Sequence, residues 1–180
     1  AMKYAVGPRK EMGIRTVFNI LGPLTNPAGA KRQVLGVFAD KLTETLATVL
    51  GKLGSLDVMV VHGEDGLDEI TISNGTKVSR YKDGKLDTFY VSPEDFGLQR
   101  ADVKTLIGGE KDENARILTS ILEGEKGPKR DAVLMNASAA LVVAGKTDDF
   151  KDAMLIAADA IDSGSALRKL AEIKKVSNSI

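Results

Sequence analysis

The sequence predicts an α/β fold, a mixed, largely parallel β-sheet with helices packed on it. Two short and almost wholly apolar runs, at residues 33–39 and 57–62, are typical of strands that are buried on both faces of a parallel sheet. Between them, apolar residues recur at helical spacing from Leu42 to Leu53, after Asp40, which we expect to cap that helix. Strand, helix and strand joined by short connections predict a βαβ unit with a right-handed crossover.

Residues 69–91 predict a different kind of structure. Apolar and polar residues are mixed there around Asn-Gly at 74–75 and Asp-Gly at 83–84, and both dipeptides are strong hairpin signals. We therefore expect antiparallel strands in this region, followed by a short turn or helix that begins at Ser92. Glycines then separate four predicted helices, at residues 110–123, 129–144, 149–162 and 164–175.

The amino-terminal part predicts a helix and a loop. Residues 2–13 form a weakly amphipathic pattern that ends at Gly13. An apolar stretch at 16–21 then runs into residues 22–29, where two prolines and two glycines predict a shaped loop. Near the other end of the chain, we expect Asn136 to cap a helix start that is rich in small residues.

Charge and composition exclude several classes of protein. The 25 basic and 25 acidic residues balance, so no net field favours nucleic acid or an anionic membrane as a partner. The absence of cysteine excludes disulfides and thiolate metal sites and fits a reducing compartment. No apolar run reaches the length of about 18 residues that a membrane span needs, and no signal peptide is visible at the start. We expect a cytoplasmic globular protein.

The strongest candidate for a site is an acidic loop directly after the second predicted strand. It carries the carboxylates of Glu64, Asp65, Asp68 and Glu69, which repel one another unless solvent or a cation neutralises them. In open α/β sheets, ligands collect at the carboxyl ends of strands, and Mg²⁺ commonly uses one or two carboxylates together with substrate phosphates. A solvated acidic loop is the alternative, and the position after a strand favours a metal site at Asp68 and Glu69.

Two other features are weaker candidates. Arg9 and Arg15 precede a glycine-containing segment, and arginine pairs bidentately with carboxylate or phosphate. On composition alone, a proline-rich connection with surface arginines explains that region better than a binding site. His62, the one histidine, ends the second strand without a nucleophile partner, so we interpret it as a structural hydrogen-bonding residue. Neither a Walker-type loop nor a GxGxxG motif is present.

The run RKEMGIRTVFNILGPLTNP at residues 9–27 closely resembles the signature of the anthranilate phosphoribosyltransferase family. Three later segments fall where that family has them, VVHG at 60–63, GLDE at 66–69 and LMNASAAL at 134–141, so the resemblance spans essentially all 180 residues. It implies a catalytic domain like those of nucleoside phosphorylases and phosphoribosyltransferases. It also implies a pentosyltransferase that joins anthranilate to 5-phosphoribosyl 1-diphosphate, with release of diphosphate, in tryptophan biosynthesis.

The resemblance assigns roles by position. Arg9 would contact the anthranilate carboxylate, and Gly22 and Pro23 would line the path of that substrate. Asp68 and Glu69 would hold Mg²⁺ bound to the diphosphate, where a metal stabilises the departing negative charge. The attacking aryl amine is weakly basic, so the reaction does not demand a strong base. The full-length parent would be a homodimer.

The sequence also departs from the family. Its glycine-rich diphosphate loop (Gly-Thr-Gly-Gly-Asp), its Lys-His-Gly-Asn segment and its amino-terminal helical domain are absent, and Ser138 stands where a glycine is usual. We therefore expect residues 1–180 to be the carboxyl-terminal part of an α/β catalytic domain and to be inactive in isolation. A nucleoside phosphorylase of the same fold and a noncatalytic domain that binds a ligand or partner are the alternatives.

Overall fold

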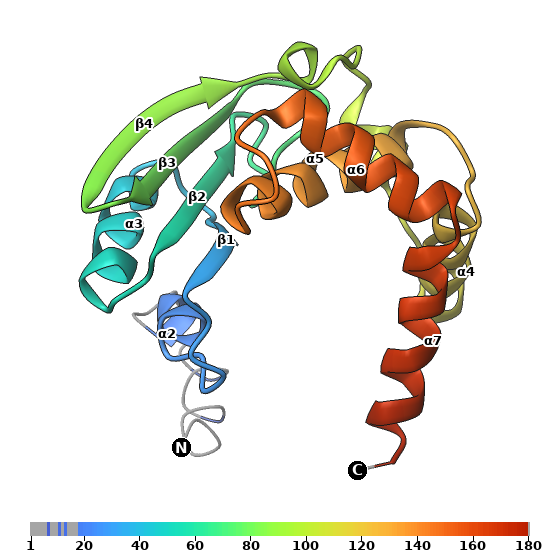
Figure 1. The fold of residues 1–180 in the computed structure, drawn as a ribbon, viewed down its shortest axis with the longest axis horizontal. Helices are drawn as coiled ribbons and strands as arrows, with labels where there is room; N and C mark the ends of the chain where they lie inside the picture. The colour runs from blue at the N-terminus through green and yellow to red at the C-terminus, as the bar shows by residue number, and fades with distance from the viewer. Residues whose placement is uncertain (1–6, 8–10, 12, 14–17, 180) are drawn as a thin grey trace. The chain divides into compact units, whose positions relative to one another are not determined.

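The structure is a computed structural model that describes residues 7, 11, 13 and 18–179. The chain divides into two compact units, residues 1–30 and 31–180, and each is described by itself. Helix α2 (Phe18–Leu24) belongs to the first unit. The elements of the second unit (Figure 1) are, in chain order, β1 (Arg32–Gly36), α3 (Leu42–Lys52), β2 (Asp57–Gly63), β3 (Thr76–Lys82), β4 (Lys85–Val91), the 3₁₀ turns η2 (Pro93–Phe96) and η3 (Val103–Leu106), and the helices α4 (Lys111–Leu122), α5 (Pro128–Val143), α6 (Phe150–Asp162) and α7 (Ser165–Ser177).

Helix α2 takes up part of the apolar stretch and the first three residues of the predicted loop, where no helix was predicted. Gly22 and Pro23, expected to open a loop, lie in its last turn, and the helix ends one residue after the proline. The amide and the hydroxyl of Thr25 close this end by donating to the carbonyl of Leu21, at 3.1 and 2.9 Å. The rest of the predicted loop, residues 25–29, is irregular as expected.

The sheet has the order β1-β2-β3-β4, and the mixed α/β class predicted from the sequence is confirmed. Strands β1 and β2 are parallel, with Arg32 opposite Asp57, and α3 connects them as the predicted βαβ unit. The pairs β2–β3 and β3–β4 are antiparallel, so the parallel part of the described sheet is confined to β1 and β2. In the described sheet β1 is an edge strand, and its residues are therefore half-buried where burial on both faces was predicted.

The two hairpin predictions have different outcomes. Asp83 and Gly84 form the tight turn between β3 and β4, with positive φ at both positions, 50° and 78°, as a type I′ turn requires. The hairpin predicted at residues 74–75 is wrong, because the strand before β3 is β2 and a long loop joins them. Ile70 and Ile72 lie in that loop and are buried in the core. Their apolar character therefore reflects core packing and not a strand.

Helices cover both faces of the sheet. On one face α3 packs against β2 and β3, where the Ser79 hydroxyl donates to Thr43 Oγ1 at 2.9 Å. Gly51 of α3 lies against the ring of Tyr81, and a Cβ at this position would come within 2.3 Å of it. The Asp40 cap prediction is wrong, because α3 follows Lys41 without a side-chain cap and the Asp40 carboxylate accepts from the Lys41 amide.

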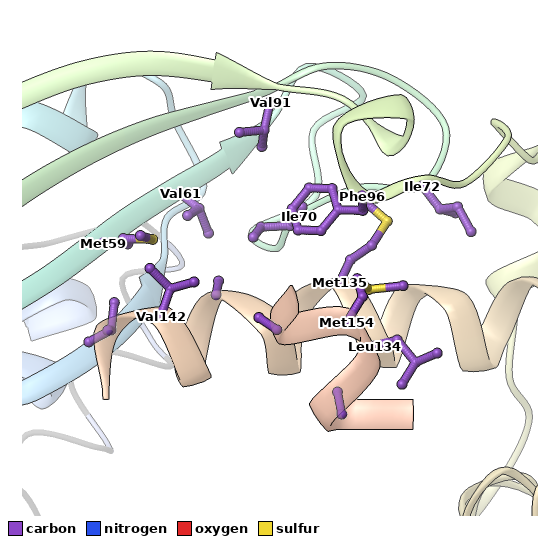
Figure 2. Close-up of a cluster of buried hydrophobic side chains, with 14 of the residues drawn as sticks. Met59, Val61, Ile70, Ile72, Val91, Phe96, Leu134, Met135, Val142 and Met154 are labelled. Atoms are coloured by element: carbon purple, nitrogen blue, oxygen red, sulfur yellow. The ribbon is translucent and has the colours of Figure 1, made fainter. Parts of the chain in front are cut away.

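The opposite face holds the main core, shown in Figure 2. Met59 and Val61 of β2 point toward α5, which contributes Met135 and Val142 to the same cluster. Alternate residues of a strand point to opposite faces, and therefore all four residues from Val58 to Val61 are buried, two under each layer. Helix α6 covers α5 and adds Met154 to this core.

The four helices predicted after residue 109 are confirmed as α4, α5, α6 and α7, with ends within about two residues of those predicted. The predicted turn or helix after Ser92 is η2, whose capping box joins Ser92 and Asp95. At the start of α6, the Asp149 carboxylate accepts from the amides of Lys151 and Asp152, at 2.7 and 3.0 Å. Within the described residues, every helix is too short or too polar to cross a membrane.

Candidate metal and substrate site

The loop after β2 is folded tightly on itself. The amide of Gly63 donates to the carbonyl of Leu67 at 2.8 Å, and the amide of Gly66 donates back to Gly63 at 2.9 Å. Gly66 has a φ of +94°, a conformation that favours glycine. The far end of the loop is fixed where the Thr71 amide donates to Thr76 Oγ1 at 3.0 Å. These hydrogen bonds fix the loop where it leaves the sheet and where it returns to it.

Asp65 serves this internal structure. Its carboxylate accepts hydrogen bonds from the hydroxyls of Thr71 and Ser73 and from the amide of Leu67, the last at 3.2 Å. Partial burial acts to raise the pKa of Asp65, but the hydrogen bonds from Ser73, Thr71 and Leu67 outweigh it and hold the pKa below its ordinary value. The charged form of one of the four clustered carboxylates is thus stabilised by donors of the loop itself.

Asp68 and Glu69 are placed differently. Both are exposed, and neither carboxylate has a hydrogen bond or ion pair with any other residue that the structure describes. Both line a cavity of about 760 Å³ between the end of the parallel strands and helices α4 and α5. The cavity is lined by Val34, Gly36, Val61, Asp68, Glu69, Leu106, Gly108, Asn114, Ile117, Ile121, Lys129, Ala132, Val133, Asn136 and Ala137.

Gly36, the last residue of β1, lies against the backbone of this carboxylate pair. A Cβ at Gly36 would stand 1.5 Å from the carbonyl oxygen of Asp68, far inside van der Waals contact. The acidic loop can therefore lie directly beside the end of β1 because residue 36 has no side chain. This places the pair at the carboxyl ends of both parallel strands, the position that open α/β sheets use for ligands.

Asn136 contacts the backbone on the Glu69 side of the carboxylate pair. Its prediction as a helix cap is wrong. It lies inside α5, which begins at Pro128 because Gly127-Pro128 is the actual start signal. Its Oδ1 accepts from the Ile70 amide at 3.0 Å, and its Nδ2 donates to the Ile70 carbonyl at 3.0 Å. The side chain thus joins helix α5 to the residue that follows Glu69.

His62 is a structural residue, as the sequence indicated. Its Nδ1 lies 2.7 Å from the carbonyl oxygen of Val37. A carbonyl only accepts, so Nδ1 carries the proton in this contact. The bond ties the end of β2 to the residue after β1.

The other residues predicted for substrate belong to the first unit. Arg9 lies outside the described residues. Gly22 is exposed and Pro23 is half-buried, both in the last turn of α2. The structure brings Asp68 and Glu69 together at one cavity, while Gly22 and Pro23 are described only within their own unit.

The exposed carboxylates of Asp68 and Glu69 suit a hard cation that also binds a ligand. Within the described part of the chain, no group of three or more His, Asp or Glu side chains is close enough to enclose a metal ion. Mg²⁺ typically takes one or two carboxylates and completes its shell with water and substrate phosphates. Two free carboxylates beside a cavity that also contains Lys129 match that donor set and leave room for an anionic ligand.

The roles of two asparagines beside this cavity were not predicted from the sequence. Asn136, expected to cap a helix, bonds to Ile70 across 66 positions, and local patterns carry no information about such a long-range contact. The Asn114 side chain makes a local contact, accepting from the Gly109 amide at 2.9 Å. The one available signal was the helix start at Gly127-Pro128, which puts Asn136 in a helix interior, where a part-buried amide needs partners.

Comparison with known families agrees with this geometry. A family model described as "Glycosyl transferase family, a/b domain" matches residues 1–167. The anthranilate phosphoribosyltransferase of Syntrophotalea carbinolica is 54% identical over 170 residues, which are 94% of this chain and 48% of that protein. The enzyme of the same name from Methanobrevibacter smithii is 50% identical over 179 residues, 99% of this chain and 53% of that protein. The chain thus spans about half the length of these relatives.

Solved structures match equally well. Anthranilate phosphoribosyltransferase from Thermus thermophilus has a TM-score of 0.86 and 41% identity, over 95% of this chain and 50% of that chain. The enzyme from Saccharomyces cerevisiae in complex with PRPP and Mg has a TM-score of 0.90 and 31% identity, over 99% of this chain and 52% of that chain. The fold and the family match agree, and the chain belongs to the glycosyl transferase family as part of its α/β domain.

Proposed function

We propose that the full-length protein carrying this chain transfers the phosphoribosyl group of 5-phosphoribosyl 1-diphosphate to anthranilate. The products are N-(5-phosphoribosyl)anthranilate and diphosphate, a step of tryptophan biosynthesis. The observation that carries the proposal is the pair of unpartnered carboxylates, Asp68 and Glu69, at a cavity beside the ends of two parallel strands. Support comes from relatives of that name across nearly the whole chain and from yeast structures with PRPP and Mg and with 4-fluoroanthranilate.

Asp68 and Glu69 are proposed to hold Mg²⁺ together with the diphosphate of the substrate. Bound Mg²⁺ would neutralise the negative charge that builds up on the leaving diphosphate. The two carboxylates suit this task because no described hydrogen-bond donor or cation competes for them. Val61, Ile117 and Ile121 form an apolar side of the cavity.

Arg9 is proposed to pair with the carboxylate of anthranilate, and Gly22 and Pro23 to line the path of its ring. Arginine offers two parallel donors that fit a carboxylate. The attacking amine of anthranilate is weakly basic, so it loses its proton easily once the bond to the ribosyl carbon forms. A dedicated general base is not required, which agrees with the commitment of His62 Nδ1 to Val37.

The remaining proposals concern the whole protein. We propose that it is cytoplasmic, acts as a homodimer, and uses neither nucleic acid nor a membrane as a partner. These 180 residues lack the glycine-rich diphosphate loop of the family, so we expect no turnover from them alone. Clear steady-state turnover by this chain would contradict that expectation.

The experiment offers the full-length protein two pairs of substrates and identifies the products by mass spectrometry. With anthranilate, 5-phosphoribosyl 1-diphosphate and Mg²⁺, we expect N-(5-phosphoribosyl)anthranilate. With a nucleoside and phosphate, we expect no free base or ribose phosphate. The opposite pattern would show a nucleoside phosphorylase, and no product from either pair would favour a noncatalytic ligand-binding domain.

A second arm tests the substrate arginine. Arg9→Ala removes a charged hydrogen-bonding group worth about 1.5–3 kcal/mol, so the KM for anthranilate should rise roughly 10- to 100-fold. The KM for 5-phosphoribosyl 1-diphosphate should stay near its wild-type value. A larger rise in the KM for 5-phosphoribosyl 1-diphosphate than in the KM for anthranilate would show that Arg9 binds the phosphorylated substrate instead.

A further inference from the structure

We infer that Asn136 is a positioning residue for the metal-binding carboxylates, since it fixes the backbone from which Asp68 and Glu69 project. This inference rests on the proposed function, because it takes the pair as the Mg²⁺ ligands. Asn136 lies on α5, 66 positions away from Ile70, and reaches the acidic loop from across the cavity.

The contact is bidentate. Asn136 Oδ1 accepts from the Ile70 amide and Nδ2 donates to the Ile70 carbonyl, both at 3.0 Å. The second proton of Nδ2 goes to the carbonyl of Ala132 in the preceding turn of α5, also at 3.0 Å. The carboxamide therefore satisfies both backbone groups of one loop residue and is itself held by its own helix. Neither Nδ2 proton is left for a ligand, so the role of this side chain is to support the acidic loop. We call the three hydrogen bonds of Asn136 the brace of the loop.

The other side of the pair is fixed by packing. Gly36 lies against the Asp68 carbonyl, where a Cβ would stand 1.5 Å away. Ile70 is 1% exposed, so its side chain anchors the loop in the core directly after Glu69. The two carboxylates thus project from a short piece of backbone that is held at both ends, at Gly36 and at Asn136.

This brace matters because the carboxylates themselves are unrestrained. Their side chains have no partners among the described residues, and adjacent negative charges repel each other when the cation is absent. The backbone is therefore what fixes the points from which both side chains start, and hence the region that their carboxylates can reach. Groups that orient metal ligands in this way typically change metal affinity 10- to 100-fold when they are removed.

The experiment measures Mn²⁺ binding to the full-length protein in the presence of inorganic diphosphate. Two variants remove the brace: Asn136→Leu deletes all three hydrogen bonds, and Asn136→Asp keeps the acceptor for the Ile70 amide but loses both donors. Ser138→Ala is the matched control, because Ser138 is a buried polar residue of the same helix whose hydroxyl bonds only to Leu134 at 2.7 Å. Circular dichroism checks that each variant is folded.

We expect Mn²⁺ to bind about 10- to 100-fold more weakly to both Asn136 variants and with wild-type affinity to Ser138→Ala. Amide hydrogen exchange at Ile70 should speed up without any metal in Asn136→Leu, which removes the acceptor for that amide, and a general loss of helix stability would not confine the change to that position. Wild-type Mn²⁺ affinity in a folded Asn136 variant, or an equal loss in Ser138→Ala, would overturn the inference.

Two further measurements separate the inference from the function on which it rests. Asp68→Asn with Glu69→Gln should abolish Mn²⁺ binding; if binding persists, the metal assignment fails and the Asn136 role fails with it. If that double variant loses Mn²⁺ binding while the Asn136 variants keep it, the metal assignment stands and only the positioning role of Asn136 is overturned. If both Asn136 variants unfold, amide hydrogen exchange of the wild-type protein tests the inference instead. The Ile70 amide should exchange more slowly than the Glu69 amide, and equal rates would overturn the inference.

Discussion

Three of the four carboxylates of the loop after β2, those of Asp65, Asp68 and Glu69, divide into two kinds according to their surroundings. Asp65 accepts three hydrogen bonds from its own loop and has a lowered pKa, so it is part of the loop structure. Asp68 and Glu69 have no such donors among the described residues and line the cavity. A carboxylate with satisfied lone pairs stabilises the fold, whereas one without partners is available to a cation.

Gly36→Ala tests the close approach of β1 to the acidic loop. The added methyl group would collide with the Asp68 carbonyl, so the loop must move. We expect a loss of about 1–3 kcal/mol in the free energy of unfolding, as for other overpacked sites. Urea denaturation measures this loss, and Gly7→Ala is the control because, apart from the chain neighbours and the backbone of its own helix, no atom of the described residues lies within 4 Å of the added carbon there. Equal stability of the two variants would contradict the close contact.

The Arg130–Asp162 pair predicts a pH dependence of stability. Arg130 is 3% exposed, and its Nη1 donates to Asp162 Oδ1 at 2.7 Å. This hydrogen bond from Arg130 holds the pKa of Asp162 at about 2, below its ordinary 3.8. A lowered folded-state pKa means that the stabilisation is complete above about pH 4 and is lost as the pH falls toward 2.

Asp162→Asn should therefore lower the Tm at neutral pH and make the fall of Tm between about pH 4 and pH 2 shallower than in the wild type. Thermal melts across that range measure both effects. Asp159→Asn, at an exposed position of the same helix, is the control and should follow the wild-type curve. Parallel curves for Asp162→Asn and the wild type would contradict the pairing.

At the residue scale, sequence reasoning identified the groups that chemistry makes conspicuous. Asp68 and Glu69 stood out because four mutually repelling carboxylates gather in a loop that directly follows a buried strand. Gly36 and Asn136 did not, since their importance lies in contacts with the Asp68 and Ile70 backbone that no local pattern encodes. Asn136 was predicted as a cap because an asparagine followed by small residues fits a helix start as well as a helix interior.

At the element scale, the packing of α6 on the core provides a matched pair of substitutions. Met154 is 8% exposed and belongs to the main core, whereas its neighbour Leu155 is 71% exposed. Met154→Ala should cost about 2–5 kcal/mol of unfolding free energy and lower the Tm by roughly 4 °C or more. Leu155→Ala should change it by less than about 0.5 kcal/mol. Similar losses in both, measured by calorimetry, would contradict this orientation of α6.

Elements were predictable where one signal dominated. Helices α4 to α7 are separated by glycines, and the Asp-Gly turn at 83–84 needs the positive φ that these residues tolerate. The Asn-Gly at 74–75 gave the same signal without a hairpin, because the residues before it are tied to side chains and to the core rather than to a neighbouring strand. The burial of β1 was overestimated for a related reason, since a sequence does not show which strand lies at an edge.

At the scale of the whole molecule, the fold class followed from the alternation of strands and helices, and the family followed from long specific runs such as residues 9–27. The family match over residues 1–167 and the coverage of about half of each relative agree with the interpretation of the chain as part of a catalytic domain. The activity that we propose belongs to the full-length protein, and this chain spans about half the length of its relatives.

The rate of N-(5-phosphoribosyl)anthranilate formation by the full-length protein, measured across a range of Mg²⁺ concentrations, tests the central claim most directly. The wild type should show saturable Mg²⁺ dependence, and Asp68→Asn with Glu69→Gln should lose it together with turnover. Glu64→Gln is the control, because it removes a carboxylate of the same loop that does not line the cavity, and it should keep the wild-type dependence. Unchanged Mg²⁺ dependence in the double variant, or an equal loss in Glu64→Gln, would contradict the assignment of this site.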